Sequence, residues 1–183
     1  MTIPNLLTLG RIFLTPVLVW LLLDGRYNTA LAVFSVAGLT DALDGLIARL
    51  FNQKSRFGAY IDPLADKILL VTSFVILGYI GMIPLWLVII AVSRDIMILL
   101  GLFTLVFYQI KVEINPVVSS KLTTLCQLLT VFLRLGSSLV TLPDWSYMGL
   151  YLITAAFSIF SGARYLYIGI SALEIHRTRN TDL

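Results

Sequence analysis

The chain has 183 residues, of which 58% are hydrophobic and only 13% are charged. Water-soluble domains rarely have such a composition, and apolar runs near the roughly 18 to 20 residues that cross a bilayer recur along the whole chain. The net charge of +3 comes without the dense basic patch that a nucleic-acid-binding surface needs. The sequence therefore predicts a polytopic membrane protein with no nucleic-acid partner.

Six helices are predicted from the apolar runs, over residues 4–23, 28–50, 59–80, 84–108, 118–141 and 147–173. The first run is too long for a typical signal peptide and has no small-residue cleavage site before Asp24, so we interpret it as the first span. Gly and Pro mark turns in "DGRYN", "GMIP" and "TLPDW", and the polar stretch "YQIKVEINPVVSSK" separates the fourth and fifth helices. We expect an all-α fold with one domain over residues 1–183, a single bundle of six transmembrane helices.

Basic residues in the loops and the tail set the expected orientation. An N-in path of six spans leaves Arg26 in a loop on the outer side and places the others on the inner side: Arg49, Lys54, Arg56, Lys111, Lys121, Arg177 and Arg179. By the positive-inside rule both termini are cytoplasmic. The expected location is a bacterial inner (cytoplasmic) membrane.

Four acidic residues stand out in this apolar chain, two near the end of the second predicted helix and two near the start of the third: Asp41, Asp44, Asp62 and Asp66. Spacings of three and four residues place each pair on one helical face, at a similar depth near the cytoplasmic side. Clustered carboxylates repel one another there unless cations neutralise them. Oxygen ligands without a nearby His or Cys favour Mg²⁺ or Mn²⁺ and leave Ca²⁺ open. We therefore predict a site for one divalent ion or a pair.

Small and basic residues beside the acids indicate what such a site would hold. Gly45 and Ala48 keep the acidic face of the second helix flat, and Gly58 does the same one turn before Asp62, so a ring or a phosphate could approach the backbone. Arg49 can bind two phosphate oxygens at once. The alternative is that these acids and bases only form interhelical salt bridges.

The run D-A-L-D-G-L-I-A-R, eight further residues and then G-A-Y-I-D-P-L-A-D match every defining position of D-x-x-D-G-x-x-A-R-x8-G-x3-D-x3-D. That pattern is the signature of the CDP-alcohol phosphotransferases, and the chain resembles this family over the 26 residues from Asp41 to Asp66. Eight fixed positions at fixed spacing make the match specific. The resemblance extends more weakly over the rest of the chain, including the opening "IPNLLTLGR" and the six spans.

The resemblance implies a membrane enzyme of phospholipid biosynthesis that uses two divalent ions, Mg²⁺ or Mn²⁺. The four residues that would bind them are Asp41, Asp44, Asp62 and Asp66, and Asp66 would also be the general base. A hydroxyl would attack the lipid-linked phosphorus of CDP-diacylglycerol and expel CMP at the cytoplasmic face.

The resemblance also assigns substrate-binding positions and an assembly state. The CDP part would be bound by Gly45, Ala48, Arg49 and Gly58. Members of the family often form homodimers through their membrane helices, so we expect a homodimer here.

The acceptor alcohol is left open between two candidates. The chain is similar to the branch that makes phosphatidylglycerol phosphate from glycerol 3-phosphate, or cardiolipin from phosphatidylglycerol, and Arg94 and Lys121 are its candidate acceptor-binding cations. Phosphatidylglycerol phosphate synthases tend to carry Glu in place of Asp95, a further Arg one to two turns later, and Lys in place of Thr123. Thr123→Lys is therefore expected to raise the use of glycerol 3-phosphate. An ion pair between Arg94 and Asp95 inside the bundle is the structural alternative.

Two other kinds of function stay open. Intramembrane carboxylates also mark ion pathways, so a divalent-cation transporter is the main alternative. Against it, the acids sit at one face of the membrane and no polar ladder continues outward from them. A membrane scaffold without enzymatic activity would leave the aligned acids unexplained.

Overall fold

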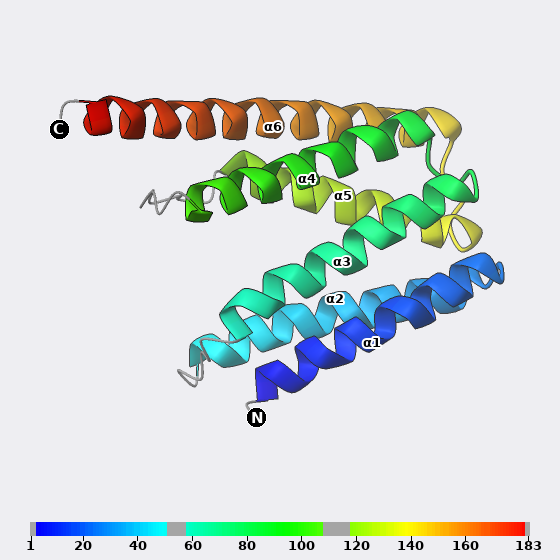
Figure 1. The fold of residues 1–183 in the computed structure, drawn as a ribbon. Coiled ribbons are helices and arrows are strands. Elements are labelled where there is room, and N and C mark those ends of the chain that lie inside the picture. Colours follow the sequence, from blue (N-terminus) through cyan, green and yellow to red (C-terminus); the bar gives the residue numbers. More distant parts are fainter. Residues whose placement is uncertain (1–2, 51–57, 108–117, 182–183) are drawn as a thin grey trace. The chain divides into compact units, whose positions relative to one another are not determined.

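The computed structural model describes residues 3–50, 58–107 and 118–181, with side chains for residues 8–40, 64–101, 103–104 and 119–171. All regular structure in this part of the chain is helical (Figure 1). The helices are α1 (Ile3–Leu23), α2 (Tyr27–Leu50), α3 (Gly58–Tyr79), α4 (Leu85–Phe107), α5 (Val118–Leu135), the short 3-10 helix η1 (Gly136–Ser138) and α6 (Asp144–Thr181). The predicted all-α class and the six long helices are confirmed.

Glycines in the left-handed conformation end the first and third helices. Gly25 has a φ of 75° and Gly81 a φ of 77°, which glycine adopts without a Cβ clash. The Gly25 N–H donates to the Leu22 carbonyl at 3.3 Å, and the Arg26 N–H donates to the Leu21 carbonyl at 2.9 Å. The same pair of bonds recurs around Gly81. Both are Schellman motifs, and they confirm the turns predicted in "DGRYN" and "GMIP".

The fifth helix ends at Leu135, so the predicted end at residue 141 is wrong. Gly and Ser residues follow it, and both types favour helix ends over helix interiors. The Ser137 hydroxyl donates to the Arg134 carbonyl at 2.8 Å, and the Ser138 hydroxyl donates to Asn28 Oδ1 at 2.5 Å. These bonds close the helix and tie η1 to the start of α2.

The sixth helix is longer at both ends than its apolar run predicts, since it spans Asp144–Thr181. Pro143 directly precedes it, and the Asp144 carboxylate in its first turn interacts favourably with the positive end of the helix dipole. Its 38 residues extend about 57 Å, which exceeds the roughly 30 Å thickness of a bilayer core. Apolar periodicity identified the span but not its polar ends.

Two compact units make up the chain. The first comprises Met1–Leu85 and Leu128–Pro143, and in it α1 lies against both α2 and α3 (Figure 1). A stripe on α1 is buried with the heptad-like spacing of a packed helix: Thr8, Arg11, Thr15, Leu18 and Leu22. Apolar side chains of the neighbouring helices complete this core: Ala30, Phe34, Ala37, Leu69, Leu70, Phe74 and Leu77.

The second unit comprises Trp86–Gln127 and Asp144–Leu183, and so contains most of α4, the first part of α5 and α6. Its buried residues include many polar ones: Arg94, Asp95, Ser119, Thr123, Gln127, Thr154, Ser158 and Ser161. Large apolar side chains on the same helices are exposed instead: Leu99, Leu100, Phe103, Leu125, Ile159 and Phe160. The pattern of a water-soluble domain is therefore inverted.

By length and hydropathy, one helix among the described residues is apolar enough to cross a bilayer, α6 over Asp144–Ser171. Shorter apolar stretches cover Thr8–Leu23 and Tyr27–Thr40. Six separate spans and cytoplasmic termini thus remain predictions, as does a single domain over residues 1–183.

Candidate active site

An ion pair between α1 and α3 marks the polar end of the first unit. Arg11 lies on the buried stripe of α1, and its Nη1 donates to Oδ1 of Asp66 on α3. The Arg11 side chain is 1% exposed, whereas that of Asp66 is 40% exposed. A guanidinium buried among apolar helices is costly unless a carboxylate neutralises it, so this contact holds the two helices in register.

The exposure of Asp66 gives it a chemical capacity that a buried partner would lack. Because Arg11 engages one carboxylate oxygen and the side chain is partly exposed, the second oxygen can accept a proton or bind a cation. Asp66 was predicted as metal ligand and general base, and its exposed carboxylate fits both roles.

The backbone places the other predicted metal ligands near the same end of the helices. Asp41 and Asp44 lie on α2, and Asp62 lies on α3 one turn before Asp66. At 1.5 Å per residue, Asp41 is about 21 Å from the start of α2 and Asp66 about 20 Å from the end of α3. Because α2 and α3 run in opposite directions, the start of α2 and the end of α3 lie at the same end of the unit (Figure 1). Asp41 and Asp66 therefore lie at similar distances from that end.

Several predicted site residues have side chains outside the described part of the chain. They are Asp41, Asp44, Asp62, Gly45, Ala48, Arg49 and Gly58, which the structure places on α2 and α3 by backbone alone. Where side chains are described, no three acidic, His or Cys side chains form a metal-binding group. Among the predicted metal ligands only Asp66 has a described side chain, so the metal site and the CDP-binding residues remain predictions.

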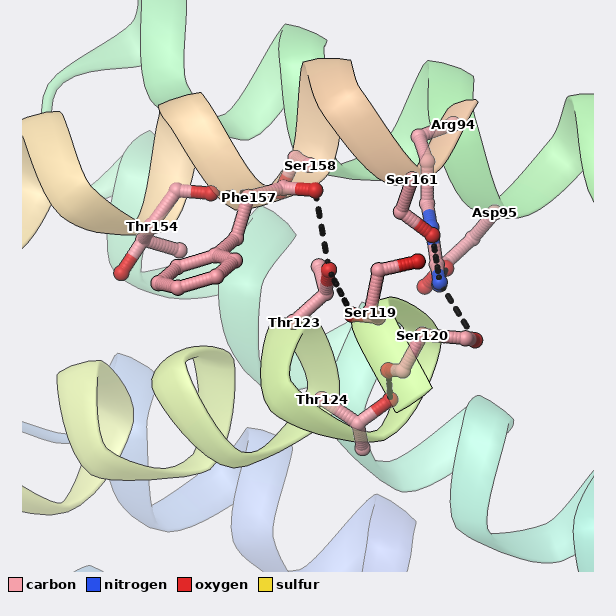
Figure 2. Close-up of polar contacts among 10 residues, drawn as sticks. All are labelled: Arg94, Asp95, Ser119, Ser120, Thr123, Thr124, Thr154, Phe157, Ser158 and Ser161. Atoms are coloured by element: carbon pink, nitrogen blue, oxygen red, sulfur yellow. Dashed lines mark hydrogen bonds and ion pairs between the residues drawn. The ribbon is translucent and has the colours of Figure 1, made fainter. Parts of the chain in front are cut away.

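A second charged cluster lies in the other unit, around Arg94 on α4 (Figure 2). Its Nη1 donates to Asp95 Oδ1 at 2.5 Å, and its Nη2 donates to the hydroxyls of Ser120 on α5 at 2.6 Å and Ser161 on α6 at 2.8 Å. Arg94 and Asp95 are each 3% exposed. This one guanidinium therefore joins three helices and carries its counter-charge beside it.

Hydroxyl groups extend these buried polar contacts along the interface of α5 and α6 (Figure 2). Thr123 is fully buried, and its Oγ1 donates to the carbonyls of Ser119 at 2.8 Å and Phe157 at 3.0 Å. Glycine at position 162 leaves room for the end of the Met97 side chain, because a Cβ there would lie 2.9 Å from Met97 Cε, whereas its distance of 3.6 Å from Arg94 Cγ would be an ordinary contact. Thr123, where phosphatidylglycerol phosphate synthases tend to carry Lys, is thus part of the interface between α5 and α6.

The two predicted acceptor-binding cations differ in their surroundings. Arg94 is buried and bonded to Asp95, which is the structural alternative considered from the sequence. Lys121 follows Ser120 on α5 and has an exposed side chain. The structure thus leaves Lys121 as the more accessible of the two, and acceptor binding by either remains a prediction.

Sequence reasoning did not assign a role to Arg11. The signal was present, because Arg11 is an isolated charge within the apolar run of the first helix, in the stretch "IPNLLTLGR". What the sequence could not supply was its partner, which lies 55 residues away.

Comparison with known proteins decides the family. The model of the CDP-alcohol phosphatidyltransferase family matches residues 1–161. The chain belongs to this family. The match confirms the family predicted from the signature Asp41–Asp66 and extends it over α1 to α5 and the first part of α6.

Individual relatives of this CDP-alcohol phosphatidyltransferase carry two names. A rat and a human protein named cardiolipin synthase (CMP-forming) are each 37% identical over 191 residues, which cover 95% of this chain. The chain spans 63% and 64% of their lengths, less than two thirds. An Aquifex aeolicus protein named CDP-diacylglycerol--glycerol-3-phosphate 3-phosphatidyltransferase is 35% identical over 130 residues, covering 68% of this chain and 70% of that protein.

Proposed function

We propose that this protein transfers the phosphatidyl group of CDP-diacylglycerol to a glycerol-type hydroxyl and releases CMP. Family membership and the intact signature from Asp41 to Asp66 support this reaction. The names of the rat and Aquifex relatives agree on the reaction class and differ in the acceptor.

Asp66 would take the proton in this reaction. The acceptor hydroxyl oxygen attacks the lipid-linked phosphorus, the bond from that phosphorus to the CMP oxygen breaks, and CMP leaves with the bonding electrons. The hydroxyl proton passes to the oxygen of Asp66 that Arg11 does not engage. A partly exposed carboxylate held by one oxygen suits this task.

Two divalent ions, Mg²⁺ or Mn²⁺, would be held by the four signature carboxylates: Asp41, Asp44, Asp62 and Asp66. This all-oxygen donor set fits hard cations. When bound, the ions neutralise the pyrophosphate and stabilise the charge that develops on it. Gly45, Ala48, Arg49 and Gly58 would receive the CDP part.

Phosphatidylglycerol is the acceptor we favour, with cardiolipin as the product, and the carrying observation is the buried pair of Arg94 with Asp95. A guanidinium that is already neutralised offers little to the dianionic phosphate of glycerol 3-phosphate, which needs several cations. Phosphatidylglycerol carries one phosphodiester charge and a free glycerol hydroxyl. Glycerol 3-phosphate remains the second candidate because of the name of the Aquifex relative.

The protein would act as a polytopic membrane protein, and the distribution of side chains supports this. Polar residues line the interior of both units, while large apolar side chains on the same helices are exposed. Such a surface suits lipid, which is as apolar as the exposed residues.

Exposed aromatic residues indicate where the membrane boundary lies along the helices. All three tryptophans of the chain, and Tyr79, lie at helix ends next to the turns that an N-in path places outside: Trp20, Trp86 and Trp145. Trp and Tyr are enriched at the interface between lipid and water. With Tyr79 at the outer interface, Asp66 lies about 20 Å away along α3, toward the cytoplasmic face. We infer an active site at the cytoplasmic face and cytoplasmic termini. The bacterial inner membrane and the homodimer are proposed from the family resemblance.

A head-to-head assay tests the choice of acceptor. Purified protein in lipid receives CDP-diacylglycerol, Mg²⁺ and either phosphatidylglycerol or glycerol 3-phosphate, and lipid products are separated. We expect cardiolipin to form at least as fast as phosphatidylglycerol phosphate. Saturable formation of phosphatidylglycerol phosphate without cardiolipin would return the assignment to the glycerol 3-phosphate enzyme.

A further inference from the structure

Arg11 is a buried cation in contact with the signature carboxylate of Asp66. It lies on α1, outside the signature segment, and its Nη1 donates to Asp66 Oδ1. Neighbours on the same buried stripe are Thr8, one turn before it, and Thr15, whose hydroxyl donates to the Arg11 carbonyl at 3.0 Å. The guanidinium is therefore held on a packed helix face rather than on a mobile surface side chain.

The contact divides the work of the two Asp66 oxygens. A carboxylate without a fixed partner can rotate, and it can bind a cation through both oxygens at once. With Oδ1 bonded to the planar guanidinium of a buried arginine, rotation is restricted and one oxygen remains for the site. The two partners differ in exposure, since Arg11 is 1% exposed and Asp66 is 40% exposed.

We propose that Arg11 is a positioning residue that, by holding Oδ1 of Asp66, reserves the other oxygen for the acceptor hydroxyl. The proposal rests on the proposed transferase function and adds to it a residue from outside the signature. Arg11 touches neither substrate nor reacting atoms and acts through the orientation of Asp66. Its loss would allow the Asp66 carboxylate to turn both oxygens toward a bound ion and so remove the proton acceptor from its place.

This role predicts a split between catalysis and ion binding that a purely structural role would not give. Arg11→Met fills a similar volume without charge, and its partner Asp66 keeps access to water because it is partly exposed. We expect kcat to fall by about 10- to 100-fold, with KM for CDP-diacylglycerol changed by less than about threefold, since uniform binding is retained. Mn²⁺ affinity should be unchanged or higher, because Asp66 gains an oxygen for the ion.

Two variants control the comparison. Arg11→Lys keeps a donor and a charge but loses the planar fork, so it should recover part of the kcat that Arg11→Met loses. Thr15→Val alters the same buried face of α1 without touching Asp66. Its kcat should stay within about twofold of wild type, because the substitution removes no contact made in the transition state.

The experiment uses the full chain in nanodiscs of zwitterionic lipid. CMP release gives kcat and KM, free Mn²⁺ measured by electron paramagnetic resonance gives ion affinity, and thermal unfolding checks the fold. A wild-type kcat in Arg11→Met, or an Mn²⁺ affinity that falls in parallel with kcat, would overturn the positioning role. Absence of CMP release from the wild type would overturn the transferase function instead, and the Mn²⁺ titration would still decide whether Arg11 restrains Asp66.

Discussion

Asp66 is the residue at which fold and proposed chemistry meet. One oxygen of its carboxylate accepts a hydrogen bond from the buried Arg11 and neutralises it, and the side chain is 40% exposed. The same residue thus stabilises the contact of α1 with α3 and is available to a substrate. Its variants must therefore be judged by folding and by turnover together.

Asp66→Asn should separate these two contributions. An amide can still accept a hydrogen bond from Arg11 through its oxygen, but it cannot take a proton from the acceptor hydroxyl. We expect CDP-diacylglycerol to bind with metal while turnover falls by about 100-fold or more. Equilibrium binding and single-turnover CMP release measure the two quantities. Equal losses in affinity and rate would make Asp66 mainly a ligand.

Asp62→Asn tests the proposed metal site. A neutral amide cannot replace a carboxylate ligand of a divalent cation, so transfer should be abolished while the protein remains folded. Asp24→Asn is a matched control, because Asp24 is exposed at the turn after α1 and pairs with the exposed Arg26. Full activity of Asp62→Asn at ordinary Mg²⁺ would refute the metal site.

At the residue scale, the family was predictable from the spacing of its signature, whereas the partner of Arg11 was not predictable. The signature acids were recognisable because eight positions recur at fixed intervals. Arg11 was not, since an arginine in an apolar run can face lipid, a headgroup or a partner. Only the packing of α1 against α3 distinguishes these cases.

At the scale of elements, Arg94 and Asp95 show how a buried pair can serve helix packing. Adjacent residues on a helix do not normally face each other, so from the sequence this ion pair was only the alternative to a role in acceptor binding. The bonds to Ser120 and Ser161 turn the Arg94 side chain inward and bring it beside Asp95. These polar contacts, together with apolar packing, connect α4, α5 and α6.

Removing one partner of this pair should cost more than removing both. Asp95→Leu leaves a buried guanidinium without its counter-charge and should destabilise the protein by about 3 to 5 kcal/mol. The double variant R94M/D95L removes both charges and should lose much less, because well-packed apolar groups can replace a buried ion pair. Unfolding in detergent compares the three proteins. A double variant as unstable as Asp95→Leu would contradict the structural role.

The structure reverses the expectation for Thr123→Lys. The sequence suggested that a cation there would help bind glycerol 3-phosphate, but Thr123 is fully buried and bonded to the Phe157 carbonyl. A lysine would have to bury its ammonium between α5 and α6. We now expect lower stability and no gain in glycerol 3-phosphate use, with Thr123→Val, which should cost only about 0.5 to 1.5 kcal/mol, as the control. A stable Thr123→Lys with selective glycerol 3-phosphate transfer would refute this.

Helix boundaries were predictable where glycine ends a helix and less so where polar residues continue one. The turns at Gly25 and Gly81 were marked by the sequence itself. The last turns of α6 were missed because the prediction followed apolar residues, whereas a helix outside lipid needs none. The early end of α5 depends on a contact between Ser138 and Asn28, which no local pattern reveals.

For the whole molecule, the decisive feature is that polar side chains are buried and large apolar side chains are exposed on the same helices. Both units bury arginine, serine or threonine side chains beside their apolar core residues, and both expose leucine and phenylalanine side chains. Hydropathy alone identifies one helix among the described residues as a span. The side-chain distribution supports the proposed membrane location, because buried polar contacts and an apolar surface suit a protein in lipid.

The central claim, metal-dependent phosphatidyl transfer, is tested most directly by CMP release from CDP-diacylglycerol in proteoliposomes. We predict CMP formation that requires phosphatidylglycerol, stops when EDTA removes divalent ions and returns with Mg²⁺ or Mn²⁺. Asp62→Asn protein in the same lipid supplies the background. Wild-type CMP release no greater than that background, with acceptor and metal present, would contradict the account.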